Sequence, residues 1–125
     1  MLGDHDSMAT VGVKDLAKAR QFYEGKLSLK PTGEQEPGSL SYKTGKSTLF
    51  VYESRYAGTN QATAVTFVVG DQVESIVRAL KAKGVAFEHY DLPPLRREGD
   101  LHVGGDMKVA WFKDLDGNII FVVGI

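Results

Sequence analysis

The 125-residue sequence contains no cysteine. This absence excludes disulfide bonds, a thiolate nucleophile and cysteine-ligated zinc, and it fits a reducing compartment, so we expect a cytoplasmic protein. An excess of charge of one sign is also missing: 15 Lys and Arg face 16 Asp and Glu, a formal net charge of −1. Because a chain without a basic excess has little to neutralise phosphates, a nucleic-acid partner is not expected.

Long apolar stretches are lacking as well. The longest uninterrupted one, Ile119 to Val123, is far shorter than the roughly 20 residues that cross a bilayer. The first seven residues are acidic and contain no apolar stretch, so we expect neither a signal peptide nor a membrane partner. What is present, 42% hydrophobic and 25% charged residues, is typical of a globular protein. The length suits one domain over residues 1–125.

The two halves of the sequence resemble each other at an offset of 56 residues, the separation of Thr10 from Thr66. Residues 10–15 read TVGVKD and residues 66–71 read TFVVGD, so each looks like a strand that ends in Asp. A helical pattern of apolar residues follows both. Asp15 and Asp71 stand where a side-chain oxygen caps a helix. Gly84 and its counterpart Ser28 mark the predicted helix ends.

Three strand-like runs follow each helix. They are residues 29–32, 40–43 and 48–52 in the first half, and residues 85–90, 108–113 and 118–123 in the second. The turn signals Thr44-Gly45-Lys46 and Asp116-Gly117 join strands into hairpins. Residues 91–107 are predicted to be one long irregular loop, a kind of segment that is often functional. Each half is therefore predicted to be a βαβββ module, the first over about residues 8–54 and the second over about 64–125.

Two tandem βαβββ modules, with Phe22-Tyr23 on an Asp-capped first helix, resemble the vicinal oxygen chelate superfamily of glyoxalases, bleomycin-resistance proteins and extradiol dioxygenases. The matching motifs are VKDLAKARQFY at residues 13–23, LSL at 27–29 and AWFKDLDGN at 110–118. In the last motif Leu115 replaces the proline that is usual in the family. The resemblance implies an α+β fold in which both modules form one cup-shaped mixed sheet, with helices on the outer face and a ligand inside. It also implies a homodimer.

Enzymes of this superfamily hold a divalent metal ion with His, Glu or Gln side chains from four strands. The resemblance carries these positions onto four residues that offer no such donor: Met8, Phe50, Ala64 and Phe121. A register shifted by one residue would move the second position to Leu49 or Val51. Hydrocarbon side chains and one soft thioether suit none of the usual cations, so neither a metal nor another cofactor is expected.

Apolar side chains at those positions would form the floor of the predicted cup, with polar and aromatic neighbours around a ligand. We predict a ligand-binding set of Thr10, Phe50, Tyr52, Thr66, Trp111, Phe121 and, from the long loop, His102. For two of these residues a structural role is as good an explanation as ligand binding. Trp111 would then be a core residue between the modules, and Tyr52 a packed side chain. Arg96 and Arg97 either gate an anionic ligand or belong to a solvated charged loop.

Three functions are compatible with the sequence. The first, which we predict, is metal-free binding of an apolar or aromatic small molecule. The second is a lyase, isomerase or dioxygenase of the superfamily whose metal site lies elsewhere. The third is an interaction module whose cup is filled by Phe50 and Phe121. Nucleophilic catalysis has no support in the sequence, because cysteine is absent and the serines follow no triad pattern. Whether the protein is an enzyme stays open at this point.

Overall fold

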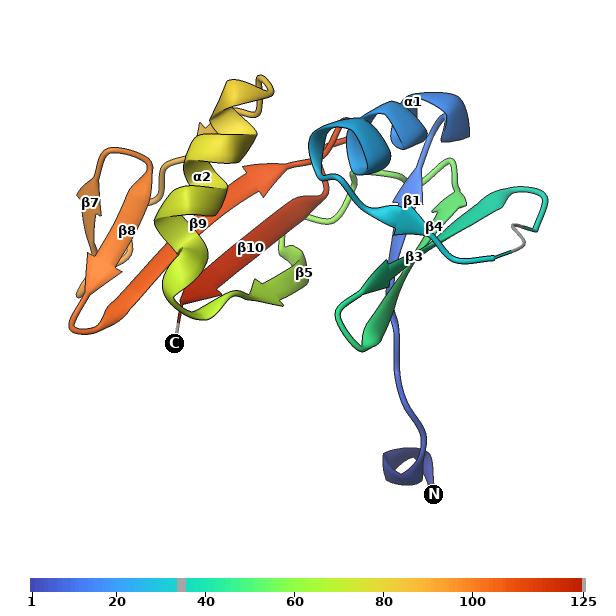
Figure 1. The fold of residues 1–125 in the computed structure, drawn as a ribbon, viewed down its shortest axis with the longest axis horizontal. Coiled ribbons are helices and arrows are strands. Elements are labelled where there is room, and N and C mark those ends of the chain that lie inside the picture. The colour runs from blue at the N-terminus through green and yellow to red at the C-terminus, as the bar shows by residue number, and fades with distance from the viewer. Residues whose placement is uncertain (34–35, 125) are drawn as a thin grey trace.

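The computed structural model describes residues 1–33 and 36–124. Within these residues the strands form two sheets, which correspond to the two predicted modules (Figure 1). The first sheet has the order β1-β4-β3-β2, with β1 parallel to β4 and the other pairs antiparallel. Its strands are β1 (Ala9–Val13), β2 (Lys30–Pro31), β3 (Ser39–Thr44) and β4 (Ser47–Glu53).

The second sheet has the order β5-β10-β9-β8-β7, and β6 also pairs with β9. Only the β5–β10 pair is parallel. The strands are β5 (Thr63–Val68), β6 (Phe87–Glu88), β7 (Arg96–Glu98), β8 (Leu101–Gly104), β9 (Met107–Lys113) and β10 (Ile119–Gly124). The α+β class and the organisation into two modules are thus confirmed.

The helices follow the first strand of each module. Helix α1 (Leu16–Arg20) continues as the π-helix η2 (Gln21–Lys26), and α2 (Val73–Ala82) lies across β9 and β10 (Figure 1). Short 3₁₀ turns form at η1 (Leu2–Asp4) and η3 (Gly70–Gln72). None of the helices in the described part of the chain is long and apolar enough to span a membrane.

The predicted helix caps differ between the modules. The Asp15 carboxylate accepts a 3.1 Å hydrogen bond from the Lys18 backbone N–H, which confirms this cap. The prediction for Asp71 was wrong, because Asp71 lies inside η3 and the residue before α2 is Gln72, whose side chain makes no capping bond. The extra 3₁₀ turn moves the helix start beyond the repeat position.

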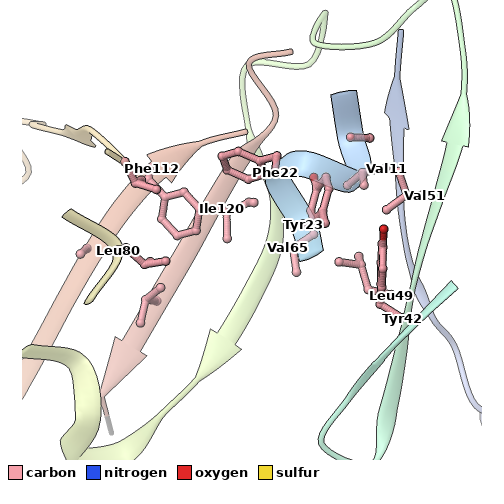
Figure 2. Packing of buried hydrophobic residues seen from close by; sticks show 14 of the residues in the cluster. Val11, Phe22, Tyr23, Tyr42, Leu49, Val51, Val65, Leu80, Phe112 and Ile120 are labelled. Atoms are coloured by element: carbon pink, nitrogen blue, oxygen red, sulfur yellow. The ribbon is translucent and has the colours of Figure 1, made fainter. Parts of the chain in front are cut away.

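Phe22 and Tyr23 fill the space between the two sheets (Figure 2). The Phe22 ring lies 6.4 Å from that of Phe112 in the second sheet, and the Tyr23 ring stacks at 6.0 Å on that of Tyr42 in the first. Strands β1 and β5 come into contact where the sheets meet, but the described strands form no ladder between them. We attribute the division of the predicted single sheet into two to these rings, which hold the sheets apart.

The prediction of an irregular loop over residues 91–107 was wrong, because β7 and β8 form a hairpin within it. Strand β7 reads Arg-Arg-Glu and is exposed throughout. It lies at the sheet edge, where charged residues are common, so it shows none of the apolar alternation by which strands are recognised. The predicted strands 29–32 and 85–90 are also shorter than expected, with two residues each in β2 and β6.

Candidate functional site

Each sheet has one face covered by helices and one open face. Side chains alternate along a strand, so buried neighbours identify the covered side. In β4, Leu49 and Val51 are buried at 1% and 0% exposure, and Phe50 between them points to the open face. The second position implied by the resemblance therefore stays at Phe50.

The open face of the first sheet holds three of the predicted ligand residues. The Phe50 and Tyr52 rings stack with centroids 6.2 Å apart at an interplanar angle of 17°. Thr10 is paired with Phe50 in the β1–β4 ladder. Tyr52 is 40% exposed, and Met8, just before β1, is 52% exposed. This face thus presents two aromatic rings to its surroundings.

The open face of the second sheet holds the other four. Trp111 and Phe121 are cross-strand partners, and their rings stack at 4.7 Å and 28°. Thr66 is paired with Phe121 in the β5–β10 ladder. Trp111 and Phe121 are both half-buried, so part of each ring remains uncovered. Ala64 lies two residues before Thr66 and shares its face.

His102 lies on β8, so its prediction as a loop residue was wrong. Its ring is 1% exposed and meets the Trp111 ring edge to face, with centroids 4.9 Å apart. The Tyr90 backbone N–H donates a 3.0 Å hydrogen bond to His102 Nε2. The buried Nδ1 atom has no hydrogen-bond partner among the described residues. His102 therefore supports the Trp111 ring and holds the segment at Tyr90 in place.

The seven predicted ligand residues consequently form two groups, one on each sheet. The ring contacts of Phe50 remain within the first sheet, and those of Trp111 and Phe121 within the second. A groove of about 610 Å³ opens where the sheets meet, and Thr66 borders it. Much of its lining comes from covered-face residues such as Ala9, Leu49, Val65 and Phe67. The groove thus does not unite the two aromatic pairs.

The donor set of the metal enzymes is not reproduced at the corresponding positions. These positions hold a thioether at Met8, a methyl group at Ala64 and phenyl rings at Phe50 and Phe121. Within residues 1–33 and 36–124, no three His, Cys, Asp or Glu side chains are grouped closely enough to bind a metal ion. The residues present do not fit a divalent cation, which needs converging nitrogen or oxygen donors.

A buried polar network, which the sequence did not reveal, lies beside these faces. Asp114, only 6% exposed, accepts a 2.6 Å hydrogen bond from the Tyr23 hydroxyl and a 2.8 Å bond from Asn118 Nδ2. The backbone N–H groups of Asp116 and Asn118 each donate a 2.9 Å bond to its other oxygen. Burial, and then the nearby Asp114 charge, raise the pKa of the Tyr23 hydroxyl.

Asn118 extends this network to the first module, because its Nδ2 also donates a 2.8 Å bond to the Gly12 carbonyl oxygen of β1. The β9–β10 hairpin is thereby fixed both to η2 and to β1. The available sequence signal was the Asp-Leu-Asp-Gly-Asn spacing of residues 114–118, which we interpreted as a hairpin turn and as part of a family motif but not as a buried network. The network's role is structural, since it sets the position of one open face relative to the other.

These features define a protein built from two paired βαβββ modules. The chain belongs to the Glyoxalase/Bleomycin resistance protein/Dioxygenase superfamily, whose family model matches residues 7–122. No curated protein matches the sequence significantly.

Solved structures show the same fold at low sequence identity. An integron cassette protein from the mobile metagenome of the Halifax Harbour sewage outfall is 18% identical, with a TM-score of 0.70 over 97% of this chain and 100% of its own. The fosfomycin resistance protein FosX from Listeria monocytogenes is 18% identical, with a TM-score of 0.71 over 97% and 93%. Lactoylglutathione lyase from Agrobacterium tumefaciens is 16% identical, with a TM-score of 0.69 over 96% and 92%.

Proposed function

We propose that the protein binds an apolar or aromatic small molecule on the open faces of its sheets, without a metal ion or other cofactor. The observation that carries this proposal is the parallel stack of Trp111 and Phe121, two half-buried rings at 4.7 Å on a face without a helix. A planar ligand laid on this pair would remove apolar surface from water and gain roughly 0.5–1.5 kcal/mol per ring contact beyond the burial itself.

The chemistry of the four metal-equivalent positions supports the metal-free part of the proposal. Methyl, phenyl and thioether groups at Met8, Phe50, Ala64 and Phe121 favour contact with hydrocarbon over coordination. One of the similar structures is named as a lyase and another, FosX, as a fosfomycin resistance protein. Their sequence identity to this chain is too low to transfer an activity. Binding, rather than catalysis, is the function that these side chains support best.

We further propose that a second copy of the chain completes the site, in a homodimer. Strands β2 and β7, which lie away from the β1–β5 contact, each pair with a neighbour on one side only among the described strands, so each sheet has a free outer edge. Apolar side chains on the open faces are uncovered in the single chain, including Val68 at 65% and Met8 at 52% exposure. Free strand edges and exposed apolar groups are both typical of surfaces that pair with another chain.

Light scattering coupled to size exclusion tests the dimer. We expect a mass near twice the 13.7 kDa of one chain, and a mass of one chain across the micromolar range would overturn the dimer without affecting the ligand proposal.

Titration calorimetry with 1-naphthalenemethanol, a neutral bicyclic probe, tests ligand binding, and Trp111 fluorescence locates the probe because this is the only tryptophan. We expect micromolar binding with quenching of Trp111. Phe121→Leu should weaken the affinity about tenfold, since a stacking surface is lost. The matched control is Tyr56→Leu. It removes a 65% exposed ring that contacts the Arg55 guanidinium, and this variant should bind the probe with unchanged affinity.

Two results would contradict the proposal. Failure of naphthalene probes of every charge to bind would favour the interaction module. Micromolar binding of Zn²⁺, Ni²⁺ or Mn²⁺ that persists after removal of residues 1–7 would favour the enzyme with a metal site elsewhere.

A further inference from the structure

The two open faces carry positive charges that have no ion-pair partner in the described part of the chain, although the whole chain has a net charge of −1. On the second sheet the relevant residue is Arg97 of β7, which is paired with His102 in the β7–β8 ladder. Cross-strand partners project from the same face, so Arg97 stands beside the His102 ring that contacts Trp111. The Arg97 side chain is exposed and forms no ion pair or hydrogen bond with the described residues.

Arg96, its neighbour in sequence, provides a contrast. Alternation places Arg96 on the opposite side of β7, and its guanidinium pairs with Glu98 at 3.0 Å. Arg97, on the open face, is therefore the arginine that has no carboxylate partner among the described residues.

The first sheet shows the same arrangement. Lys30 and Lys43 are direct cross-strand partners in the β2–β3 ladder, and Lys43 is in turn paired with Thr48 of β4. Thr48 shares the open face with Phe50, two residues along the strand, so the lysines lie within a long side chain's reach of the Phe50–Tyr52 pair. Neither ammonium group has an ion pair with the described residues.

Two like charges placed opposite each other lower stability, and a bound anion between them would offset this cost. The described strand residues on the two open faces include one carboxylate, Glu88, and it is already paired with Lys113 at 3.2 Å. The described residues thus leave these positive charges without an ion-pair partner next to both aromatic pairs.

We propose that the ligand is an aromatic anion, a planar ring system that carries a carboxylate or a similar acidic group. The rings would stack on Trp111 and Phe121 while the acidic group pairs with Arg97, and the lysines would supply the same charge on the other sheet. An arginine is well suited to this role, because its planar guanidinium binds a carboxylate through two parallel hydrogen bonds. This inference rests on the proposed function and adds the charge of the ligand to it.

Three probes of one shape and different charge test the inference: 1-naphthoate, 1-naphthalenemethanol and 1-naphthylmethylammonium. Calorimetry at pH 7 in low-salt buffer should give about tenfold tighter binding for 1-naphthoate than for the alcohol, and the weakest binding for the ammonium compound. Added salt should reduce this preference, since exposed ion pairs are screened.

Two pairs of variants identify the charges responsible. Arg97→Gln should abolish most of the preference for 1-naphthoate and leave the affinity for the alcohol unchanged, whereas the control Arg96→Gln should keep both. On the other sheet, Lys43→Gln should reduce the preference, and Lys46→Gln, in the adjacent turn, should not.

Each outcome separates the inference from the function on which it rests. Equal affinities for naphthoate and alcohol would overturn the aromatic anion but retain the aromatic-binding function. Tightest binding of the ammonium compound would likewise overturn the aromatic anion and retain the aromatic-binding function. Absence of binding by all three probes would overturn both, and equal effects of Arg96→Gln and Arg97→Gln would reject Arg97 as the specific partner.

Discussion

The Tyr23 hydroxyl donates a 2.6 Å hydrogen bond to Asp114, a residue 91 positions later in the sequence, and both side chains are buried. Tyr23 belongs to η2 of the first module, and Asp114 begins the turn between β9 and β10 of the second. One hydrogen bond to a carboxylate therefore connects the helix of one module to the hairpin of the other.

Replacement of Tyr23 by Phe should lower the free energy of unfolding by about 1.5–3 kcal/mol, the usual range for a hydrogen bond to a charged group. Asp114 keeps its donors from Asn118 and Asp116, so the fold should survive. Urea denaturation measures the change. Tyr52→Phe, on an exposed tyrosine, serves as the control with an expected change within about 0.5 kcal/mol. Equal losses in the two variants would contradict the assigned role.

Alkaline pH should destabilise the protein through two tyrosines. Burial raises the pKa of Tyr23 and of Tyr42, with further contributions from Asp114 and from the 2.8 Å hydrogen bond of Tyr42 to Glu24. An unfolded tyrosine titrates near pH 10, so above about pH 10 the unfolded chain releases protons that the folded chain retains. Their contribution to stability is complete below that pH and is lost as the pH rises.

Each of these tyrosines should lower the free energy of unfolding by roughly 1.4 kcal/mol per pH unit above about pH 10. Urea denaturation at a series of alkaline pH values measures the slope. Tyr23→Phe and Tyr42→Phe should each reduce it by the equivalent of one proton, and an unchanged slope in either variant would show that the hydroxyl is not held neutral in the fold.

Gly58 is the position where an added methyl group should be least tolerated. Its φ is +72°, and a Cβ there would lie 1.7 Å from the Asp116 carbonyl oxygen. Gly99 has a comparable φ of +64° but no atom near its Cβ position within the described structure. Gly99→Ala should cost about 1–2 kcal/mol of backbone strain, and Gly58→Ala about 1–3 kcal/mol more because the hairpin must shift. Thermal melts compare the two, and a smaller loss for Gly58→Ala would show that Asp116 moves freely.

His102→Ala should expose Trp111 and shift its fluorescence emission to the red, because the ring that meets it edge to face is removed. The Tyr90 backbone N–H also loses its acceptor, at a cost of about 1–3 kcal/mol. His89→Ala is the control, since that side chain is 40% exposed and pairs with Asp100 instead. An unchanged emission in His102→Ala would show that the histidine does not support the indole.

Local sequence signals predicted the elements that depend on local chemistry. The 56-residue offset placed Ser28 and Gly84 at equivalent helix ends, and both adopt positive φ angles, +60° and +87°. The turn at Gly45 was likewise predicted, and its φ is +58°. Such signals work because a left-handed backbone conformation limits which residues can occupy it.

The features that escaped prediction depend on contacts between distant parts of the chain. Strand β7 is recognisable only beside β8, because its three charged residues carry no pattern of their own. The burial of Asp114 requires Tyr23 from the other module. The placement of His102 against Trp111 follows from the pairing of β8 with β9, which no local signal in residues 91–107 indicated.

The alternation that buries Leu49 and Val51 while presenting Phe50 has an evolutionary consequence. Every second residue of a strand can be exchanged with little effect on the interior, so the residues of the open faces and those of the core are free to diverge independently. The same scaffold could exchange a hydrocarbon surface for a set of metal-coordinating side chains through a handful of substitutions, which accounts for how such different chemistries arise in one lineage.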